Sequence, residues 1–299
     1  MSVLAWMVGS LGAVTGSMTA AVYGITVKAQ KPRLCPNETL PSVPYENVSW
    51  LSQGKTVKGW LLPQYGSAGE RDPSAPVIVV AHGWSSNRSR VLRYALPLHR
   101  EGYAILMYDA RSHGESDDYR TPSGLQFRDD LIASLDWLRS QPSVDPNRIG
   151  VIGHSLGAFG AVLALDAGAN IAALVTDAMP VRFQAMIGAE LRRRRLPQFP
   201  LAMLIPRFMV WRSGIPGKTM RKANPVVILR DNADRNGTPV LLVHSRNDAF
   251  IPASELSIVL AGTPGLPHLF VESDGHSASD RDPAFWPAVK RFFHEHING

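Results

Sequence analysis

The chain has 299 residues, of which 45% are hydrophobic and 19% are charged, so it is long enough for one large domain with a substantial core. Its single cysteine, Cys35, excludes an internal disulfide framework and a multi-cysteine metal site. No His-Glu-x-x-His or comparable ligand cluster occurs in the sequence. We therefore expect neither a metal ion nor a redox cofactor.

The formal net charge of +6 is concentrated in one segment. Residues 182–222 carry eight arginines and two lysines against one acidic residue, Glu190, which leaves −3 for the rest of the chain. The densest part is the run Arg192-Arg193-Arg194-Arg195. A basic patch is one signature of nucleic-acid binding. No nucleic-acid module or stacking platform accompanies it, so we expect no nucleic-acid partner.

The N-terminal segment, residues 1–27, contains no charged side chain, and the first cations are Lys28, Lys31 and Arg33. Because about 20 apolar residues suffice to span a bilayer as a helix, we predict a transmembrane anchor over residues 1–27. The alternative is a glycine-rich leader that is removed or lies at the membrane interface. Cations only on its C-terminal side place the large domain in the cytoplasm by the positive-inside rule.

Small residues recur at every fourth position of this predicted anchor. They are Gly12, Gly16, Ala20 and Gly24. Such a ridge lets two helices approach closely, so it predicts self-association through the anchor. Residues 28–46 follow as a proline-rich linker, and residues 47–299 form the main domain.

The main domain alternates strand-like runs with helical patterns. Val77–Ala81 is apolar throughout, as expected of a strand that is buried on both faces. The other predicted strands are Val48–Leu51, Thr56–Leu62, Tyr103–Tyr108, the run that ends at Gly153, Ile171–Thr176, Val240–Val243 and His268–Val271. Predicted helices cover Val91–Arg100, the stripe Leu131, Leu135 and Leu138, the small-residue run after Leu156, and Phe285–Phe293. This alternation predicts an α/β fold with a mostly parallel sheet and helices on both faces.

The stretch from Arg148 to Ala164 is the most informative, because it reads as strand, sharp turn and helix. Its turn carries Gly-x-Ser-x-Gly centred on Ser155. Gly153 and Gly157 suit that turn, since a side chain at either position would collide with the neighbouring strand or helix. The pattern predicts a serine held in a strained turn, with its hydroxyl aimed away from the backbone.

Serine is a poor nucleophile near neutral pH, so it needs a base and an acid that orients the base. Asp248 and His276 each follow one of the last two predicted strands. Because the carboxyl ends of parallel strands meet at one edge of a sheet, both loops are expected to reach Ser155. Asp177, which also follows a buried strand, is the alternative acid. It could instead pin the first turn of the segment that follows it.

Four motifs in this order resemble the α/β-hydrolase superfamily, over residues from about 50 to 297. They are His82-Gly83, Asp109 to Ser116, the turn at Ser155, and the loops of Asp248 and His276. More narrowly, the chain is similar to the membrane-anchored serine-hydrolase branch that includes BEM46-like proteins. It is more distantly similar to the catalytic domain of prolyl-oligopeptidase-type peptidases. The resemblance implies the α/β-hydrolase fold and a Ser155, Asp248 and His276 triad.

A developing oxyanion needs preorganised hydrogen-bond donors. The backbone N–H of Leu156, at the start of the helix after the turn, is the first expected donor. The resemblance assigns the second to the N–H of Trp84, whose ring would also supply an apolar wall. The polar residues interpreted as structural are His82, Asp109, Arg111, His113 and His154.

Residues 181–224 interrupt the sheet pattern, and the resemblance implies a helical cap over the active site there. The segment combines its cations with two apolar runs, Phe199–Pro206 and Phe208–Trp211. A cap that lines an acyl pocket, a membrane-facing patch, or both would explain the mixture. An ordinary helical cap with a solvated arginine face is the remaining alternative.

The expected function is a serine hydrolase that cleaves carboxylic esters or thioesters through an acyl-enzyme. Ser155 attacks, His276 shuttles the proton, and Asp248 orients His276. One alternative is a serine peptidase acting on short peptides, and a second is a non-catalytic, membrane-anchored scaffold. An apolar cap without a propeller-like domain favours esters. A scaffold has no physical need for an intact triad, turn and oxyanion site.

Overall fold

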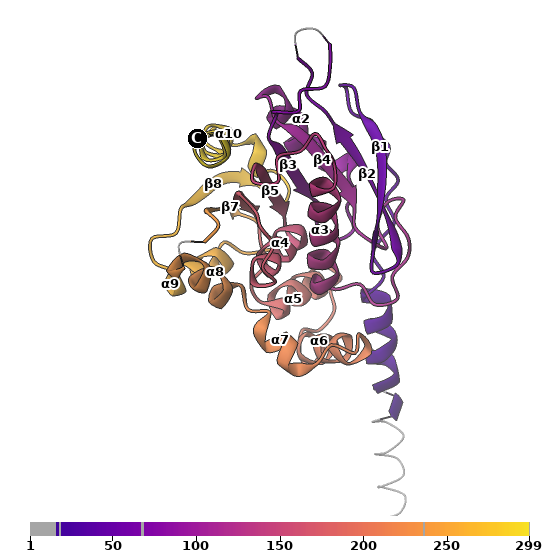
Figure 1. The fold of residues 1–299 in the computed structure, drawn as a ribbon. Helices are drawn as coiled ribbons and strands as arrows, with labels where there is room; N and C mark the ends of the chain where they lie inside the picture. Colours follow the sequence, from indigo (N-terminus) through magenta and orange to yellow (C-terminus); the bar gives the residue numbers. More distant parts are fainter. Residues whose placement is uncertain (1–15, 18, 67–68, 236, 299) are drawn as a thin grey trace, which may run out of the picture.

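The computed structural model describes residues 16–17, 19–66, 69–235 and 237–298, and it has the α/β-hydrolase fold (Figure 1). Within these residues, eight strands form one sheet in the order β1-β2-β4-β3-β5-β6-β7-β8. The β1–β2 and β2–β4 pairs are antiparallel, and the later neighbours are parallel. The predicted fold class, a mostly parallel sheet with helices on both faces, is confirmed.

Most elements lie close to their predicted ranges. The strands are β1 (Glu46–Ser52), β2 (Lys55–Leu62), β3 (Val77–Ala81), β4 (Ala104–Asp109), β5 (Ile149–His154), β6 (Ala173–Asp177), β7 (Val240–Asn247) and β8 (His268–Asp274). The helices around the sheet are α2 (Leu92–Arg100), α3 (Gly124–Arg139), α4 (Leu156–Asp166), α8 (Pro225–Asp234), α9 (Ser254–Gly262) and α10 (Phe285–Phe293). Helices α8 and α9 were not predicted from the sequence.

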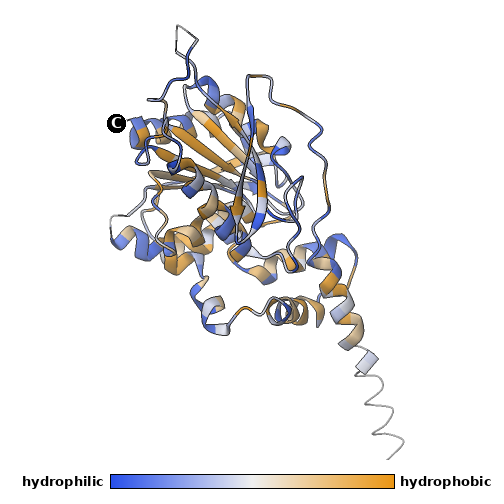
Figure 2. Ribbon diagram, turned by 45° about the vertical axis from the view of Figure 1, so that its right-hand side comes forward, coloured by the Kyte–Doolittle hydropathy of each residue, from blue (hydrophilic) through white to orange (hydrophobic). Residues whose placement is uncertain are grey.

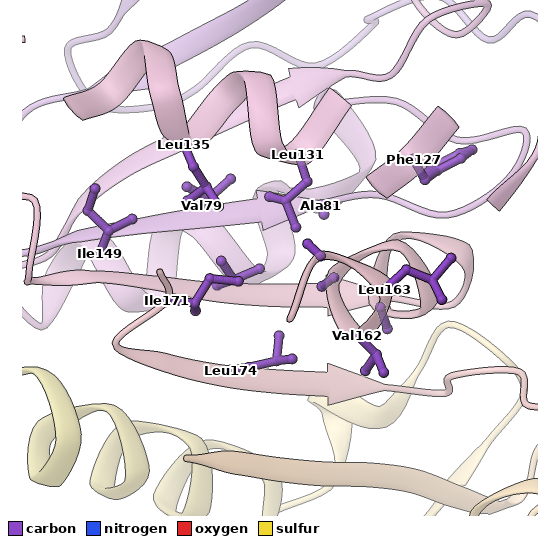
Figure 3. Close-up of a cluster of buried hydrophobic side chains, with 14 of the residues drawn as sticks. Val79, Ala81, Phe127, Leu131, Leu135, Ile149, Val162, Leu163, Ile171 and Leu174 are labelled. Carbon is purple, nitrogen blue, oxygen red and sulfur yellow. The ribbon is translucent and has the colours of Figure 1, made fainter. Parts of the chain in front are cut away.

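The sheet separates two layers of buried side chains. On one face, the α3 stripe packs on β3, and Figure 3 shows Leu135 directed toward Val79 and Leu131 toward Ala81. On the other face, α2 and α10 bury side chains such as Leu98 and Phe293. Figure 2 shows the same arrangement as hydrophobic strands enclosed between helices with hydrophilic outer faces. Burial on both faces explains why the central strands are apolar throughout.

Three helices form the cap between β6 and α8, within the predicted range 181–224. They are α5 (Phe183–Arg193), α6 (Leu201–Arg212) and α7 (Gly217–Lys222), at the lower end of Figure 1. The fully buried carboxylate of Glu255 fixes the start of the cap by accepting hydrogen bonds from the N–H groups of Val181 (3.0 Å) and Arg182 (2.7 Å). The hypothesis that Asp177 pins this turn was wrong, because the Asp177 carboxylate bonds to other partners beneath the turn at Ser155.

Residues 19–29 form a helix that packs against the cap. Val22 is buried in a cluster with Ile187, Leu191, Ile205 and Met209. The ring of Tyr23 contacts Trp211, with 6.2 Å between ring centroids. Gln30, only 1% exposed, donates to the Ser213 hydroxyl (3.0 Å). The second half of the predicted anchor is therefore joined to the cap.

The first part of the predicted anchor, residues 1–15 together with residue 18, lies outside the described residues. In the part of the chain that the structure describes, no helix has the length and apolar character needed to cross a membrane. Of the predicted ridge, Gly16, Ala20 and Gly24 are exposed, and a Cβ at either glycine would meet nothing within 4 Å. Self-association through the ridge remains a prediction.

Residues 31–45 have no helix or strand, but they are held against the domain. The N–H of Arg33 donates to the Ser85 hydroxyl (3.0 Å), and the Asn37 amide donates to the Asp109 carboxylate (2.9 Å). The segment between the N-terminal helix and β1 therefore follows the loop after β3. That loop also carries Trp84, a predicted site residue.

Candidate active site

The turn between β5 and α4 holds Ser155 in an unusual backbone conformation. Its φ is 53° and its ψ is −118°, a strained combination for a residue with a side chain. The N–H of Ser155 donates to the Asp177 carbonyl (2.8 Å), which helps to hold the turn. This geometry aims the hydroxyl away from the backbone, as the Gly-x-Ser-x-Gly pattern predicted.

Close packing explains both glycines of the pattern. A Cβ at Gly153 would lie 2.6 Å from Cα of Ala158 in α4. A Cβ at Gly157 would lie 2.4 Å from the carbonyl oxygen of Ala81, at the end of β3. The neighbouring atoms are backbone in both cases and cannot rotate away, so only glycine fits. The predicted collisions with strand and helix are confirmed.

The structure brings the three predicted triad residues together. The Ser155 hydroxyl lies 2.9 Å from Nε2 of His276, and Nδ1 of His276 lies 2.7 Å from Oδ2 of Asp248. These residues follow β5, β8 and β7, which are parallel strands in the same half of the sheet, with β6 between β5 and β7. The alternative acid, Asp177, has no hydrogen bond to His276. The geometry therefore selects Asp248 as the partner of the histidine.

Local contacts hold the Asp248 carboxylate ionised. Burial is the largest single influence on the pKa of Asp248, and it raises that pKa. The hydrogen bonds and the charge that lower the pKa outweigh burial when they are added together. The hydrogen bond and charge of His276, with the N–H groups of Ile251 and Phe250 that donate to Oδ1 (both 2.8 Å), leave the pKa below its usual value. An anion in this position favours the histidine tautomer that carries its proton on Nδ1.

The predicted oxyanion donors are the backbone N–H groups of Leu156 and Trp84. Leu156 is the first residue of α4, so its N–H points out of the positive end of the helix dipole. The turn that carries Trp84 packs against the turn that carries Ser155. A Cβ added at Gly83, the residue before Trp84, would lie only 3.0 Å from Cβ of Ser155. Within the described chain, neither the Leu156 N–H nor the Trp84 N–H has a hydrogen-bond acceptor. Both groups are available to an oxyanion.

A second histidine–carboxylate pair lies beneath the first. His154 Nδ1 is 3.1 Å from Oδ2 of Asp177, and His154 Nε2 is 3.2 Å from the Ser277 hydroxyl. Tyr94 donates a 2.5 Å hydrogen bond to the same Asp177 oxygen. Sequence reasoning missed Tyr94 and Ser277 entirely. The one available signal was the position of Asp177 at the end of a buried strand.

Burial sets the ionisation of this second pair. It lowers the pKa of His154 to about 4, despite the hydrogen bond to Asp177. For Asp177, burial is the largest influence and raises the pKa, but the hydrogen bond and charge of His154, with Tyr94, bring it down to about 2. At neutral pH the pair therefore consists of a neutral imidazole and a carboxylate.

The polar residues interpreted as structural brace the loops around Ser155. The N–H of Ala110 donates to Nε2 of His82 (2.9 Å), which connects the loops after β3 and β4. Asp109 and Arg88 form a buried ion pair of 2.5 Å. The structural interpretation of His82 and Asp109 is confirmed by these contacts.

A cavity of about 1610 Å³ opens beside Ser155 and His276. Pockets for drug-sized ligands measure about 300–1,000 Å³, so this cavity has room for a longer, flexible molecule. The cap contributes an apolar wall that includes Phe183, Ile187 and Met209. Residues 28–33, from the segment predicted as a linker, supply another part of the wall. No sequence signal indicated that they would lie there, because the contact joins distant parts of the chain.

The fold and this site agree with the comparison of the sequence with known families. The pattern of the alpha/beta hydrolase family matches residues 78–288. The match spans the turn of Ser155 and the loops of Asp248 and His276. This chain belongs to the alpha/beta hydrolase family.

Comparisons with individual proteins point in the same direction. The chain is 28% identical over 204 residues to the uncharacterized protein YqkD of Bacillus subtilis (strain 168), covering 67% of this chain and 64% of YqkD, so it spans less than two thirds of that relative. Esterase Pf2001 of Pyrococcus furiosus has a similar fold, with a TM-score of 0.67 and 20% identity over 90% of this chain and 98% of the esterase. The fold is also similar to that of an acylaminoacyl peptidase, with a TM-score of 0.64 and 19% identity over 87% of this chain and 43% of the peptidase. The narrower likeness to BEM46-like proteins remains a prediction.

Proposed function

We propose that this protein is a serine hydrolase that cleaves carboxylic esters or thioesters through an acyl-enzyme intermediate. The observation that carries the proposal is the hydrogen-bonded chain from Ser155 through His276 to Asp248, with distances of 2.9 and 2.7 Å. Membership of the alpha/beta hydrolase family and the likeness of the fold to an esterase support it.

The first half of the reaction transfers the acyl group to the enzyme. Ser155 Oγ attacks the carbonyl carbon while its proton passes to Nε2 of His276. The N–H groups of Leu156 and Trp84 stabilise the negative oxygen of the tetrahedral intermediate. The intermediate then expels an alcohol or thiol, which takes the proton from His276 and leaves the acyl group on Ser155.

Water completes the cycle by the same groups in reverse order. His276 accepts a proton from the water that attacks the acyl carbon, and it returns that proton to Ser155 as the carboxylic acid leaves. Asp248 stabilises the imidazolium that exists between these transfers. The buried, ionised carboxylate and the partly exposed histidine suit these two roles.

The lining of the cavity favours esters over short peptides. A peptidase that selects free amino termini needs an acidic partner for the ammonium group. Among the described residues that line the cavity, the one carboxylate is Glu190, and its oxygens are bound by Arg193 (2.8 Å) and Arg194. No carboxylate in this lining is left for a peptide ammonium group.

A panel of esters with graded acyl length, run beside aminoacyl amides and with a serine-directed phosphonate probe, tests the proposal. We expect ester turnover, weak or no amide turnover, and probe labelling that disappears in Ser155→Ala. Labelling of Ser155→Ala at the wild-type level would contradict the assignment of the nucleophile. Faster turnover of amides than of matched esters would favour the peptidase.

We also propose that residues 1–27 attach the enzyme to a membrane, with the catalytic domain on the cytoplasmic side. The segment has no charge, and the helix of residues 19–29 lies beside α6, whose Trp211 is 70% exposed (Figure 1). The test compares the full chain with a variant that lacks residues 1–15, because later truncation removes the buried Val22. We expect the shortened protein to leave the membrane. If it stays wholly with membranes after an alkaline carbonate wash, residues 1–15 are not needed for the attachment.

A further inference from the structure

The cavity beside Ser155 is strongly cationic. Among the described residues that line it, nine are Lys or Arg and one, Glu190, is acidic. Four of these cations are engaged within the protein. Arg93 pairs with Asp280 (2.7 Å), Arg182 with Glu255 (2.6 Å), and Arg193 and Arg194 share Glu190. The excess positive charge therefore resides in the remaining five.

Those five cations have no acidic partner among the described residues. They are Lys28, Lys31, Arg33, Arg90 and Arg221. All five are exposed at the cavity wall, so none of them owes its position to an ion pair. Like charges that line one cavity repel each other and create a positive potential inside it. An anion bound there would relieve that repulsion.

Four of the five come from two chain segments that touch next to the oxyanion turn. The N–H of Arg33 bonds to the Ser85 hydroxyl (3.0 Å), and Ser85 directly follows Trp84. Arg90 lies in the short 3-10 helix Ser89–Val91 that follows the same loop. Lys28 and Lys31 precede Arg33 in the same chain segment and line the same cavity. Four of the five unpaired cations thus come from segments that lie beside the oxyanion turn, and the fifth, Arg221, comes from α7 of the cap.

The cap supplies a wall of the opposite character. The side chains of Phe183, Ile187, Leu191 and Met209 line the same cavity. Ile187, Leu191 and Met209 are buried against the N-terminal helix, so this wall is firmly packed. A cavity with one apolar wall and one cationic wall fits an amphiphile, with a hydrocarbon chain on the first and an anionic group on the second.

We propose, resting on the hydrolase function above, that the substrate is an acyl ester or thioester whose leaving part carries a phosphate monoester. Arg33 and Arg90, supported by Lys28 and Lys31, bind the phosphate, and the cap wall holds the acyl chain. Guanidinium groups match phosphate oxygens in pairs, and a phosphate monoester carries nearly two negative charges at neutral pH. A group of adjacent cations therefore suits a phosphate monoester, with its two charges, better than it suits a carboxylate, with its one.

Two substrates that differ only in charge provide the direct test. They are 1-hexanoylglycerol and 1-hexanoylglycerol 3-phosphate, in which the same ester bond is cleaved. We expect kcat/KM to be higher by about tenfold or more for the phosphorylated ester, mainly through a lower KM. A tenfold difference corresponds to about 1.4 kcal/mol of additional binding free energy from the phosphate. The preference should shrink as salt is added, because exposed charges are screened. Equal kcat/KM values at low salt would overturn the proposal.

Substitution identifies the residues responsible. In Arg33→Ala combined with Arg90→Ala, we expect the ratio of the two kcat/KM values to fall close to one. That ratio is insensitive to a general loss of active protein, because both substrates are measured on one preparation. Arg207→Ala is the matched control, since Arg207 is exposed on α6, does not line the cavity and has no acidic partner among the residues that the structure describes. A ratio that stays at the wild-type value in the double variant would overturn the proposal.

Binding to Ser155→Ala separates this inference from the hydrolase proposal, because it needs no turnover. Titration calorimetry should show that octyl phosphate binds at least about tenfold more tightly than octanol, by the same charge argument. Octyl phosphate binding in a protein that cleaves no ester would defeat the hydrolase proposal alone. Ester cleavage without preferential octyl phosphate binding would defeat the phosphate inference alone.

Discussion

Two serine–histidine–aspartate sets lie side by side at the turn after β5. In one, His276 connects Ser155 and Asp248 over 2.9 and 2.7 Å. In the other, His154 connects Ser277 and Asp177 over 3.2 and 3.1 Å. The two imidazole rings are 4.9 Å apart. The same three residue types therefore occur twice within one small region.

Their surroundings differ. The side chain of His276 is 20% exposed, whereas that of His154 is 7% exposed, and burial lowers its pKa to about 4. A base with so low a pKa accepts a proton poorly near neutral pH. Only Ser155 also stands in a strained turn beside two free N–H groups. The same three residue types therefore do not suffice for a catalytic triad, and the exposure of the histidine and the adjacent N–H donors distinguish the Ser155 set.

The largest expected effect comes from the two serines. Ser155→Ala should lower kcat by roughly 10⁶, because loss of the nucleophile disables the whole triad. Ser277→Ala, the matched control, should keep kcat within about tenfold, since it removes one 3.2 Å hydrogen bond to a neutral imidazole. Steady-state kinetics with a short activated ester measure both variants. Comparable losses in the two variants would break the distinction between the sets.

The two acids should differ next. Asp248→Asn should cost roughly 10⁴ in kcat with KM little changed, because it disturbs the histidine tautomer and destabilises the imidazolium. Asp177→Asn should retain most of kcat and lose stability, since Tyr94 and His154 lose a charged acceptor. Steady-state kinetics decide between the two acids, measured on variants that circular dichroism shows to be folded. The reverse pattern would make Asp177 the catalytic acid.

Acid sensitivity should arise from the buried set and its neighbours. Burial lowers the pKa of His154 and His82 to about 4 and that of His113 to about 3. In the unfolded chain, these histidines take up protons as the pH falls below their ordinary pKa of 6.5. In the folded protein, they take up protons only near pH 4 or 3. Unfolding free energy should therefore fall as pH drops from 6.5 toward 4, by up to about 1.4 kcal/mol per pH unit for each histidine.

Urea unfolding at several pH values measures this slope. His113→Asn is the informative variant, because it removes one of the three titrations. Its unfolding free energy should be lower at pH 7 but should depend less steeply on pH between 6.5 and 4. An unchanged slope would show that His113 is not protonated on unfolding in this range.

The smallest expected effect concerns Glu255, a buried carboxylate outside both sets, which joins the cap to the domain. Glu255→Gln should destabilise the protein by about 2 kcal/mol, since Glu255 accepts charged and backbone hydrogen bonds at the start of the cap. KM should rise by more than kcat falls, because Glu255 contacts the cap and not the triad. Thermal unfolding and steady-state kinetics test this. A kcat loss approaching that of Asp248→Asn would contradict it.

Much of the fold and site followed from local patterns. The apolar runs predicted the central strands because a strand between two helical layers has no polar face. The order of Ser155, Asp248 and His276 predicted one site because parallel strands present their carboxyl ends together. Helices α8 and α9 escaped prediction. Glu255, on α9, had no recognisable role until its contacts with Val181 and Arg182 were seen.

The sequence by itself determined the class of fold, the strained turn at Ser155 and His276 as its expected base, because these depend on periodicity, glycine sterics and chain order. Only the tertiary structure decided that Asp248 faces His276 while Asp177 faces His154, since both aspartates follow buried strands. It also decided that residues 28–33 line the cavity with the triad. Such contacts depend on how distant segments pack, and no local pattern encodes that packing.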